Sequence, residues 1–219
     1  MKTTLTEPAL GSYLAKQLDH FFPDGATTVE HEILKALPLA LERMSAILHE
    51  AAPRLFEREG AVWFNHLHSD QWAMFLYLLG HELARAGGSA EVATKLYLLN
   101  KALHGIDVFY EVRLPRYFLF MHPLGTVLGR ANYADYFVVL QNCTVGNVGG
   151  QYPSFGKGVM ICAGASILGP AIVGEDVTIG AGSLIVNTDV PARSTAVGRG
   201  KEIRFISSET PLWRRYFRV

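Results

Sequence analysis

The first half of the chain shows the hydrophobic periodicity of α-helices, in which apolar residues recur three and four positions apart. Within residues 26–49 this stripe consists of Val29, Ile33, Leu34, Leu37, Leu41, Met44 and Leu48. Ser69-Asp70-Gln71 predicts the capped start of a second helix, and Gly87-Gly88 predicts its end. Ser89 then predicts the cap of a further helix. These patterns predict an α-helical domain over residues 1–105.

From Leu114 onward glycine and valine become frequent, and a six-residue repeat replaces the helical period. Its apolar members are Met121, Val127, Tyr133, Val139 and Val145, followed by Phe155, Ile161, Ile167, Val173, Ile179, Ile185, Pro191 and Val197. A mostly small residue stands four positions after each member, as Cys143, Ala165 and Ala171 illustrate. A repeat of this kind is typical of a solenoid, in which each unit packs on its neighbours.

A six-residue period matches neither an α-helix nor a plain strand, but it fits a short strand followed by a sharp turn. Three such units complete a triangular coil, with the apolar member inside and the small residue near a corner. The chain therefore belongs to the α+β class, with the helical domain followed by a parallel β-helix of about five coils over residues 106–201. Residues 202–219 form a C-terminal tail.

One insertion interrupts the repeat between Val145 and Phe155. The extra residues, 147–153, have the sequence Asn-Val-Gly-Gly-Gln-Tyr-Pro, and a regular solenoid extrudes such a segment as a loop. Loops on rigid scaffolds often build functional sites. The alternative is an insertion that the surface tolerates without a role.

Composition narrows the functional classes. The 219 residues carry 20 Lys+Arg and 20 Asp+Glu, and 49% of them are hydrophobic. The apolar content argues against disorder, and the zero net charge argues against a general nucleic-acid binder. The longest apolar run, residues 73–80, is far shorter than the ~20 residues of a membrane span. With two cysteines, the chain is predicted to be a reduced cytoplasmic protein with neither nucleic-acid nor membrane partners.

The repeat half resembles the hexapeptide-repeat acyltransferases, and most closely the serine O-acetyltransferases. The segments that carry the resemblance are Met121–Gly129, Gln141–Gly146, Gly158–Ala165 and Ile179–Ser183. The resemblance implies a left-handed β-helix and an enzyme that moves an acetyl group from acetyl-CoA to a small hydroxyl or amine acceptor. It also implies a homotrimer with active sites between subunits, or a dimer of trimers paired through the helical domains. No metal is implied.

His122 is the expected catalytic residue. It is the one histidine after residue 104, and it follows Met121, which is predicted to point inward, so its own side chain should point outward. A neutral imidazole can take a proton from a hydroxyl or amine that attacks a thioester, if a carboxylate orients its other nitrogen. Asp107 lies 15 residues earlier, close to one coil, and the resembled family has an Asp at this offset. Asp107 is therefore the predicted partner, although it could instead cap the junction between the domains.

Two departures from the family concern the acceptor. Serine acetyltransferases carry an Asp before the catalytic His, where this chain has Met121, and an Asp-Arg-His-Pro run where it has Gly150-Gln151-Tyr152-Pro153. A buried carboxylate needs a cation or several donors, so the missing Arg argues against plain serine. Gln151 and Tyr152 suit a neutral acceptor rich in hydroxyls, such as a sugar. The resemblance makes Asp70 a candidate for the family's remaining ammonium-binding Asp, and the equally good alternative is an ordinary helix cap.

The resemblance places CoA along the coils, with its amides bonded to exposed backbone. Small residues permit that approach, and the candidates are Gly146, Ala163 and Ala181, each of which could instead serve as a turn residue. Arg199 and Lys201 follow the last coil and are candidates for the CoA phosphates.

Rival functions stay open at this point. One is acetylation of a sugar or a nucleotide-linked amino sugar in polysaccharide synthesis, and another is a non-catalytic β-helix used for assembly. A metal-dependent hydratase on the same fold would need about three histidines on the coils. The basic, aromatic segment 213–218 could touch CoA, pack on a neighbouring subunit or do neither, and packing is the favoured interpretation.

Overall fold

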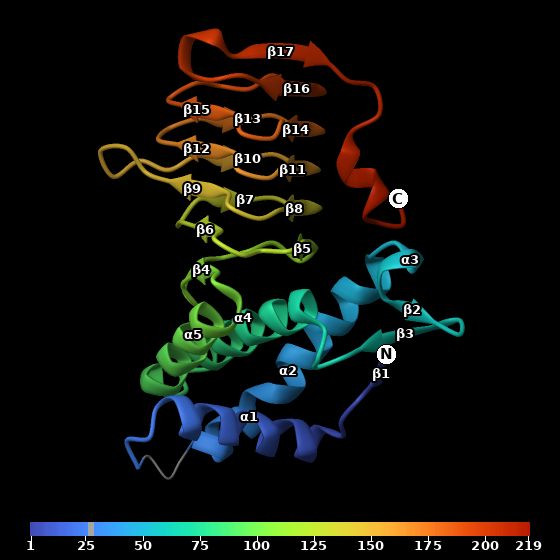
Figure 1. The fold of residues 1–219 in the computed structure, drawn as a ribbon, viewed down its shortest axis with the longest axis vertical. Coiled ribbons are helices and arrows are strands. Elements are labelled where there is room, and N and C mark those ends of the chain that lie inside the picture. The colour runs from blue at the N-terminus through green and yellow to red at the C-terminus, as the bar shows by residue number, and fades with distance from the viewer. Residues whose placement is uncertain (26–28) are drawn as a thin grey trace.

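The structure is a computed structural model that describes residues 1–25 and 29–219. A helical domain forms its base and a β-helix rises from it (Figure 1). The base contains β1 (Lys2–Thr3), α1 (Glu7–Phe21), α2 (Val29–Glu50), α3 (Pro53–Phe56), β2 (Glu57–Arg58), β3 (Ala61–Phe64), α4 (Ser69–Arg85) and α5 (Ala90–His104). Strands β1, β3 and β2 form a small sheet beside the helices.

The predicted helices are confirmed, with changes at their ends. Residues 26–28, where the first predicted stripe began, lie outside the described residues. Ser89 caps α5 as expected, since its hydroxyl accepts the Val92 N–H at 3.3 Å. The predicted cap at residues 69–71 is wrong, because α4 already begins at Ser69 and its N-cap residue is His68, whose side chain makes no capping bond.

The repeat half forms a parallel β-helix with three faces. Face 1 consists of β5 (Phe118–Phe120), β8 (Phe137–Val139), β11 (Val159–Ile161), β14 (Val177–Ile179) and β16 (Ser194–Val197), and antiparallel β17 (Arg204–Ser207) closes it. Face 2 consists of β4 (Asp107–Val108), β6 (Val127–Leu128), β9 (Thr144–Gly146), β12 (Ser166–Leu168) and β15 (Leu184–Val186). Face 3 consists of β7 (Asn132–Tyr133), β10 (Ser154–Phe155) and β13 (Ile172–Val173). This arrangement confirms the predicted β-helix of about five coils.

The interior of the β-helix follows the six-residue repeat through the middle coils. The members from Val139 to Ile185 are buried. The register is one residue off at both ends, where Leu128 is buried in place of Val127 and Val190 in place of Pro191. At the start the reason is the turn after β5, which spans residues 121–126 and is two residues longer than the next one, so that Val127 pairs with Thr144 on the outer side of face 2.

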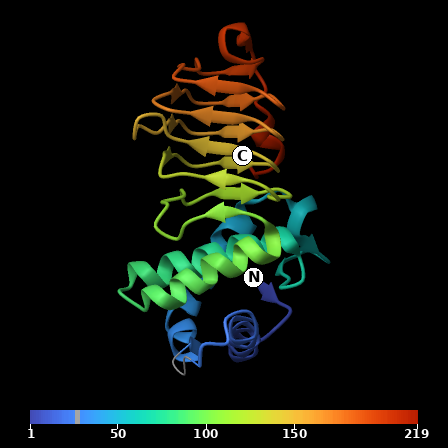
Figure 2. The same ribbon diagram turned by 60° about the vertical axis from the view of Figure 1, so that its left-hand side comes forward.

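The base and the β-helix share one hydrophobic core. Helices α4 and α5 lie side by side beneath the first coil (Figure 2). The buried Tyr77 hydroxyl on α4 donates to the carbonyl of Val112 and accepts the N–H of Leu114, which joins the helix to the chain entering face 1. Within the described residues, no helix is long and apolar enough to cross a membrane.

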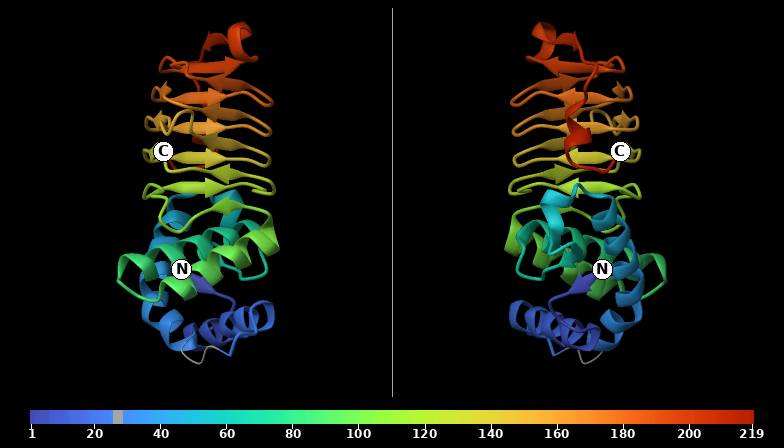
Figure 3. Two further views of the ribbon diagram at one scale, coloured as in Figure 1. Left: turned by 90° about the vertical axis from the view of Figure 1, so that its left-hand side faces the viewer. Right: turned by 90° about the vertical axis from the view of Figure 1, so that its right-hand side faces the viewer.

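The C-terminal tail returns along the β-helix toward the base (Figure 3). Trp213 is buried, its Nε1 donates to Asp176 Oδ1 at 2.9 Å, and its ring stacks on Tyr136 with centroids 5.0 Å apart. Phe217 is buried as well and pairs with Ala51 in the base. The aromatic residues Trp213 and Phe217 therefore pack within their own chain, and contact of this segment with a neighbouring subunit stays a prediction.

Candidate active site

The turns that connect face 1 to face 2 stack into one edge of the prism, called here the histidine corner (residues 121–126, 140–143, 162–165, 180–183 and 198–200). His122 lies in the lowest of these turns, and 77% of its side chain is exposed, as the sequence predicted. Its φ of 51° lies in the left-handed region, which a residue with a Cβ seldom adopts. Turn residues elsewhere in the β-helix, among them Asn142 and Asp176, share this conformation.

Asp70 reaches His122 from the N-terminal turn of α4. Its side chain is buried, and Oδ1 accepts the backbone N–H of His122 at 3.1 Å. Oδ2 lies 3.9 Å from His122 Nδ1. The carboxylate therefore faces the His122 turn and does not cap its own helix, so the capping interpretation of Asp70 is not supported.

Sequence reasoning missed His104, which lies beside Asp70 at the end of α5. Its Nδ1 lies 2.8 Å from Asn100 Oδ1, and Asn100 in turn donates to the carbonyl of Ala73. Burial lowers the pKa of His104 to about 4, although the nearby charge of Asp70 acts in the opposite direction. His104 is therefore a neutral imidazole. Its four-residue spacing from Asn100 on one helix face, just before Asp107, is the signal that could have indicated it.

Asp107 lies one layer below the His122 coil, where β4 pairs with β6. Its carboxylate is engaged by α5: Oδ1 accepts the Tyr97 hydroxyl at 2.8 Å, and Oδ2 pairs with Lys101 Nζ at 2.8 Å. Among the described residues, no ion pair joins Asp107 to His122. Asp107 thus lies one coil below His122, as predicted, but its carboxylate contacts Tyr97 and Lys101 and not His122.

Three of the residues proposed for the donor stand above His122 on the histidine corner. The backbone bonds from Gly164 to Gln141 and from Gly182 to Ala163 place Gln141, Ala163 and Ala181 one above the other. The Asn142 N–H bonds the carbonyl of Leu124, so Leu124 lies beneath Gln141, and His122 lies two residues before Leu124 in the same longer turn. Arg199 follows in the top turn, where its Nε donates to the carbonyl of Gly182 at 3.0 Å. Coils are spaced by ~4.8 Å, so this column rises roughly 19 Å above His122.

Gly146 and Lys201 lie apart from the column. Gly146 ends β9 at the far edge of face 2, where a Cβ would meet the Leu168 methyl at 2.9 Å. Lys201 is exposed in the short 3-10 helix that follows Arg199 (Gly200–Glu202). The structure thus groups Ala163, Ala181 and Arg199 along one edge, places Lys201 two residues beyond Arg199, and places Gly146 elsewhere.

The loop 147–153 projects from the edge between face 2 and face 3 (Figure 1). Tyr152 is half-buried against Gly129, where a Cβ would come within 2.6 Å of its ring, and its hydroxyl accepts from Asn147 Nδ2 at 3.3 Å. Gln151 is exposed and pairs with Val148 through its backbone. Face 2 separates this loop from the histidine corner by about four residues of extended chain, roughly 13 Å. Within one chain, Gln151 and Tyr152 therefore do not join His122.

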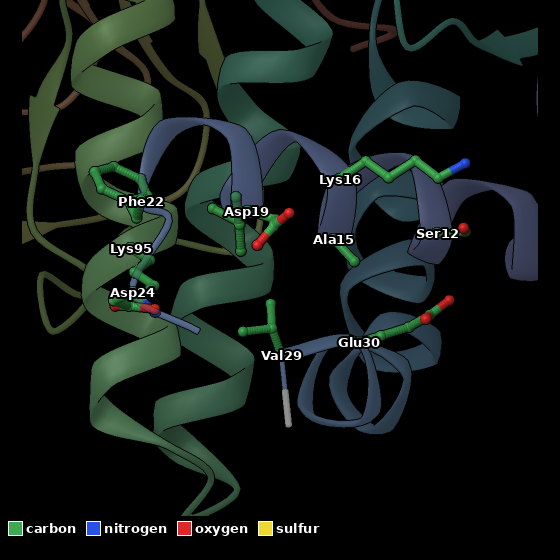
Figure 4. Close-up of a pocket in the computed structure, with 10 residues that line it drawn as sticks. Ser12, Ala15, Lys16, Asp19, Phe22, Asp24, Val29, Glu30 and Lys95 are labelled. Atoms are coloured by element: carbon green, nitrogen blue, oxygen red, sulfur yellow. The ribbon is translucent and has the colours of Figure 1, made fainter. Parts of the chain in front are cut away.

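The cysteines and the hollow between α1, α2 and α5 do not offer a competing site. Burial raises the pKa of the Cys143 and Cys162 thiols, so neither is poised as a thiolate. A hollow of about 250 Å³ between α1, α2 and α5 belongs to the helical base, and Lys95 at its edge is bound by Asp24 and Glu91 (Figure 4). In the described part of the chain, no group of three or more His, Cys, Asp or Glu is arranged to hold a metal ion.

Comparison with known proteins agrees with this architecture. A family model described as bacterial transferase hexapeptide (six repeats) matches residues 152–187. A serine acetyltransferase of Synechococcus elongatus is 36% identical over 105 residues, which cover 46% of this chain but only 43% of that protein. A serine acetyltransferase of Helicobacter pylori is 31% identical over 131 residues, which cover 58% of this chain and 75% of that one.

The structural match extends over almost the whole molecule. Soybean serine acetyltransferase, solved in complex with serine, superposes with a TM-score of 0.70 at 26% identity and covers 93% of this chain and 85% of its own. The match therefore includes the helical base as well as the coils. The expected kinship with hexapeptide-repeat acyltransferases is confirmed, and this chain belongs to the serine acetyltransferase family.

Proposed function

We propose that this protein transfers the acetyl group of acetyl-CoA to the hydroxyl of a small acceptor, with His122 as the general base. The observation that carries this proposal is the histidine corner, in which an exposed imidazole lies in the lowest turn, below a row of Gln141, Ala163 and Ala181 that ends at Arg199. A long, narrow thioester donor can lie along this row with its acyl end at His122 and its phosphates near Arg199 and Lys201.

The chemistry requires one proton carrier at the acyl end. The acceptor oxygen attacks the acyl carbon while His122 takes the hydroxyl proton, so a C–O bond forms as charge develops on the carbonyl oxygen. The C–S bond then breaks, and the imidazolium returns the proton to the departing thiolate. The products are the acetyl ester and free CoA thiol. An exposed His122 side chain at the foot of the column can serve both proton transfers without moving.

The acceptor is defined by what surrounds His122 and the loop 147–153. The relatives named above act on serine, and the buried carboxylate of Asp70 beside His122 favours an acceptor with an amino group. The loop, in contrast, presents Gln151 and Tyr152 without a cation for a carboxylate. These features support an amino acid-like acceptor with a masked carboxylate, or a sugar as the second candidate.

The site also needs a second copy of the chain. His122 is largely exposed, and the loop lies roughly 13 Å away at the other edge of face 2. A neighbouring β-helix packed along the histidine corner brings its own loop toward this His122 and shields the donor column from water. A cyclic trimer provides three such sites, and pairing of the helical bases gives a dimer of trimers.

An acceptor screen tests the proposal. Purified protein is mixed with acetyl-CoA and single acceptors, including serine, serine amides, neutral hexoses and nucleotide-linked amino sugars, and the release of free thiol is followed over time. We expect release that depends on the acceptor, with an acetylated product visible by mass spectrometry. Thiol release that no acceptor stimulates would contradict the proposal, while a sugar as the best acceptor would select the second candidate.

A further inference from the structure

A groove lined by arginines lies where the chain passes from the helical base into the β-helix. Its larger part is a hollow of about 590 Å³ between the C-terminal end of α4, the segment 110–113 and the turn after β6. A second hollow of about 360 Å³ continues beside β7 and shares three lining residues with the first. Together they form the basic groove, whose charged lining residues are Arg85, Glu111, Arg113 and Arg130, with His81 beside them.

The basic groove is separate from the proposed reaction centre. Asp70, which contacts the His122 turn, lies in the first turn of α4, whereas His81 and Arg85 lie near the end of that helix. His81 comes 11 positions after Asp70, and an α-helix rises about 1.5 Å per residue, which is roughly 16 Å. The lining residues belong neither to the histidine corner nor to the loop 147–153. A ligand in the groove would therefore occupy a second site.

Two of the arginines are held in place by glutamates that contact one nitrogen of each guanidinium group. Arg85 donates from Nε to Oε2 of the buried Glu82 at 2.7 Å, and Arg130 donates from Nη2 to Oε2 of Glu111 at 2.6 Å. The Arg130 guanidinium group also lies over the Phe109 ring, 5.8 Å from its centroid. Because a guanidinium group has five N–H donors, both arginines keep donors for a ligand while their side chains are already positioned.

Arg113 adds a positive charge that no carboxylate balances. Among the residues that the structure describes, none forms a hydrogen bond or ion pair with its exposed side chain. The two glutamates of this region face four arginines, because Glu82 is shared between Arg85 and Arg43. The groove and the residues directly behind it therefore carry two positive charges in excess. Guanidinium groups that converge on one hollow from three segments suit a phosphate or a carboxylate, whose oxygens accept paired N–H bonds.

His81 supplies a hydrogen-bond acceptor in the same groove. Its Nδ1 lies 2.7 Å from the carbonyl oxygen of Tyr110, which can only accept, so Nδ1 carries the proton and Nε2 keeps a lone pair. Burial, together with the charge of Arg43, lowers the pKa of His81, so the ring is neutral at pH 7. A ligand that fits the groove thus combines negative charge with a hydroxyl group that can donate to Nε2.

We infer that the basic groove binds a phosphate monoester that carries a free hydroxyl group, such as a small sugar phosphate. A phosphate monoester has a charge of about −1.5 to −2 at pH 7, which matches the excess positive charge of the groove. Inorganic phosphate has a similar charge but fills little of a hollow of about 590 Å³, a size that suits a small organic ligand. Because α4 and the β-helix both line the groove, the bound ester should stabilise the junction between the two halves of the chain.

Calorimetric titration of the whole chain tests this site without acetyl-CoA or an acceptor, so the result does not depend on the proposed function. Glycerol 3-phosphate and glucose 6-phosphate are compared with inorganic phosphate and sulfate at about 0.15 M salt, where non-specific attraction is screened. We expect saturable binding of at least one ester, about tenfold tighter than that of either inorganic anion. The melting temperature should rise with the concentration of that ester.

Three variants test the residues of the groove. Arg113→Ala should weaken ester binding by about tenfold or more, because it removes charge-assisted hydrogen bonds. Arg193→Ala, which removes an equally exposed arginine at another corner of the prism, is the matched control and should bind the ester as wild type does. His81→Phe keeps a ring that can stack on Tyr77 but removes the acceptor nitrogen, so it should weaken ester binding and leave sulfate binding unchanged.

The inference is overturned if neither ester binds saturably, or if inorganic phosphate or sulfate binds as tightly as the esters. Equal ester affinities of Arg113→Ala and Arg193→Ala would place the ester outside the groove. An unchanged ester affinity in His81→Phe would contradict the assignment of a hydroxyl-bearing ligand.

Discussion

Two histidines lie near Asp70, and they differ in how much of each side chain is exposed to solvent. The side chain of His122 is 77% exposed, while His104 is largely covered where α5 meets the first coil. Burial lowers the pKa of His104 to about 4, so folding holds this imidazole in its neutral form. Because burial keeps His104 neutral in the folded chain, the free energy of unfolding should fall when acid protonates this residue.

Protonation of His104 should couple stability to pH. A free histidine has a pKa of about 6.5, so between about 6.5 and about 4 the unfolded chain binds a proton that the folded chain excludes. Above that window His104 is neutral in both states and does not reduce the free energy of unfolding. As pH falls through the window, protonation of the unfolded chain reduces that free energy. Thermal melts should therefore show a falling midpoint from pH 7 to pH 5.

His104→Gln should flatten this slope, and His20→Gln, at an exposed position of α1, serves as the matched control. Equal slopes in wild type and His104→Gln would contradict this account of His104. A flattened slope in the His20→Gln protein would contradict it as well.

For single residues, the sequence indicates which side chains could act in catalysis better than it indicates which side chains contact them. His122 is identifiable because it is the one histidine after residue 104, and its exposure follows from the coil geometry. The carboxylate that contacts His122 is not identifiable in this way. Asp107 has the right offset along the chain, yet Lys101 on α5 engages it, and only the packing of α4 under the first turn brings Asp70 to His122.

At the scale of elements, the six-residue period predicts the coils but not their ends. In the middle coils the turns at each corner have the same length apart from the loop 147–153, so the register follows from counting residues. The longer turn after β5 shifts Val127 outward, and the approach to β16 shifts Pro191 outward. The C-terminal tail has no repeat at all, so its docking through Trp213 depends on a surface that only the folded chain presents.

Substitutions at the top of the histidine corner test where the phosphates of acetyl-CoA bind. Arg199→Ala combined with Lys201→Ala should raise the KM for acetyl-CoA more than it lowers kcat, because the phosphates bind equally in the ground and transition states. Steady-state kinetics at a saturating acceptor concentration measure both constants. As a control, Arg193→Ala alters an exposed arginine at the corner between faces 3 and 1. Unchanged acetyl-CoA kinetics in the double variant would place the nucleotide elsewhere.

For the whole molecule, the geometry of one chain leaves the proposed site open. His122 and the loop 147–153 stand at opposite edges of face 2, and exposed apolar residues lie along and beside that face, among them Leu124, Val127 and Val148. In the proposed trimer, packing of a second copy over these residues would bury them and close the site.

We expect at least a trimer in solution. Light scattering coupled to size exclusion at micromolar concentration measures the mass directly. Val127→Lys, which places a charge on the packed face, should shift the protein toward smaller species while leaving the monomer folded by circular dichroism. A wild-type protein that elutes as a monomer would contradict the shared site.

The most direct test of the whole account is the turnover of His122→Ala, measured beside its thermal melt with saturating acetyl-CoA and the acceptor found by the screen. General-base catalysis contributes about 10²–10⁴-fold, so the variant should lose nearly all turnover. Its melting temperature should change little, because an outward side chain leaves no cavity in the prism. A folded His122→Ala protein that keeps more than about a tenth of wild-type turnover would show that His122 is not the base.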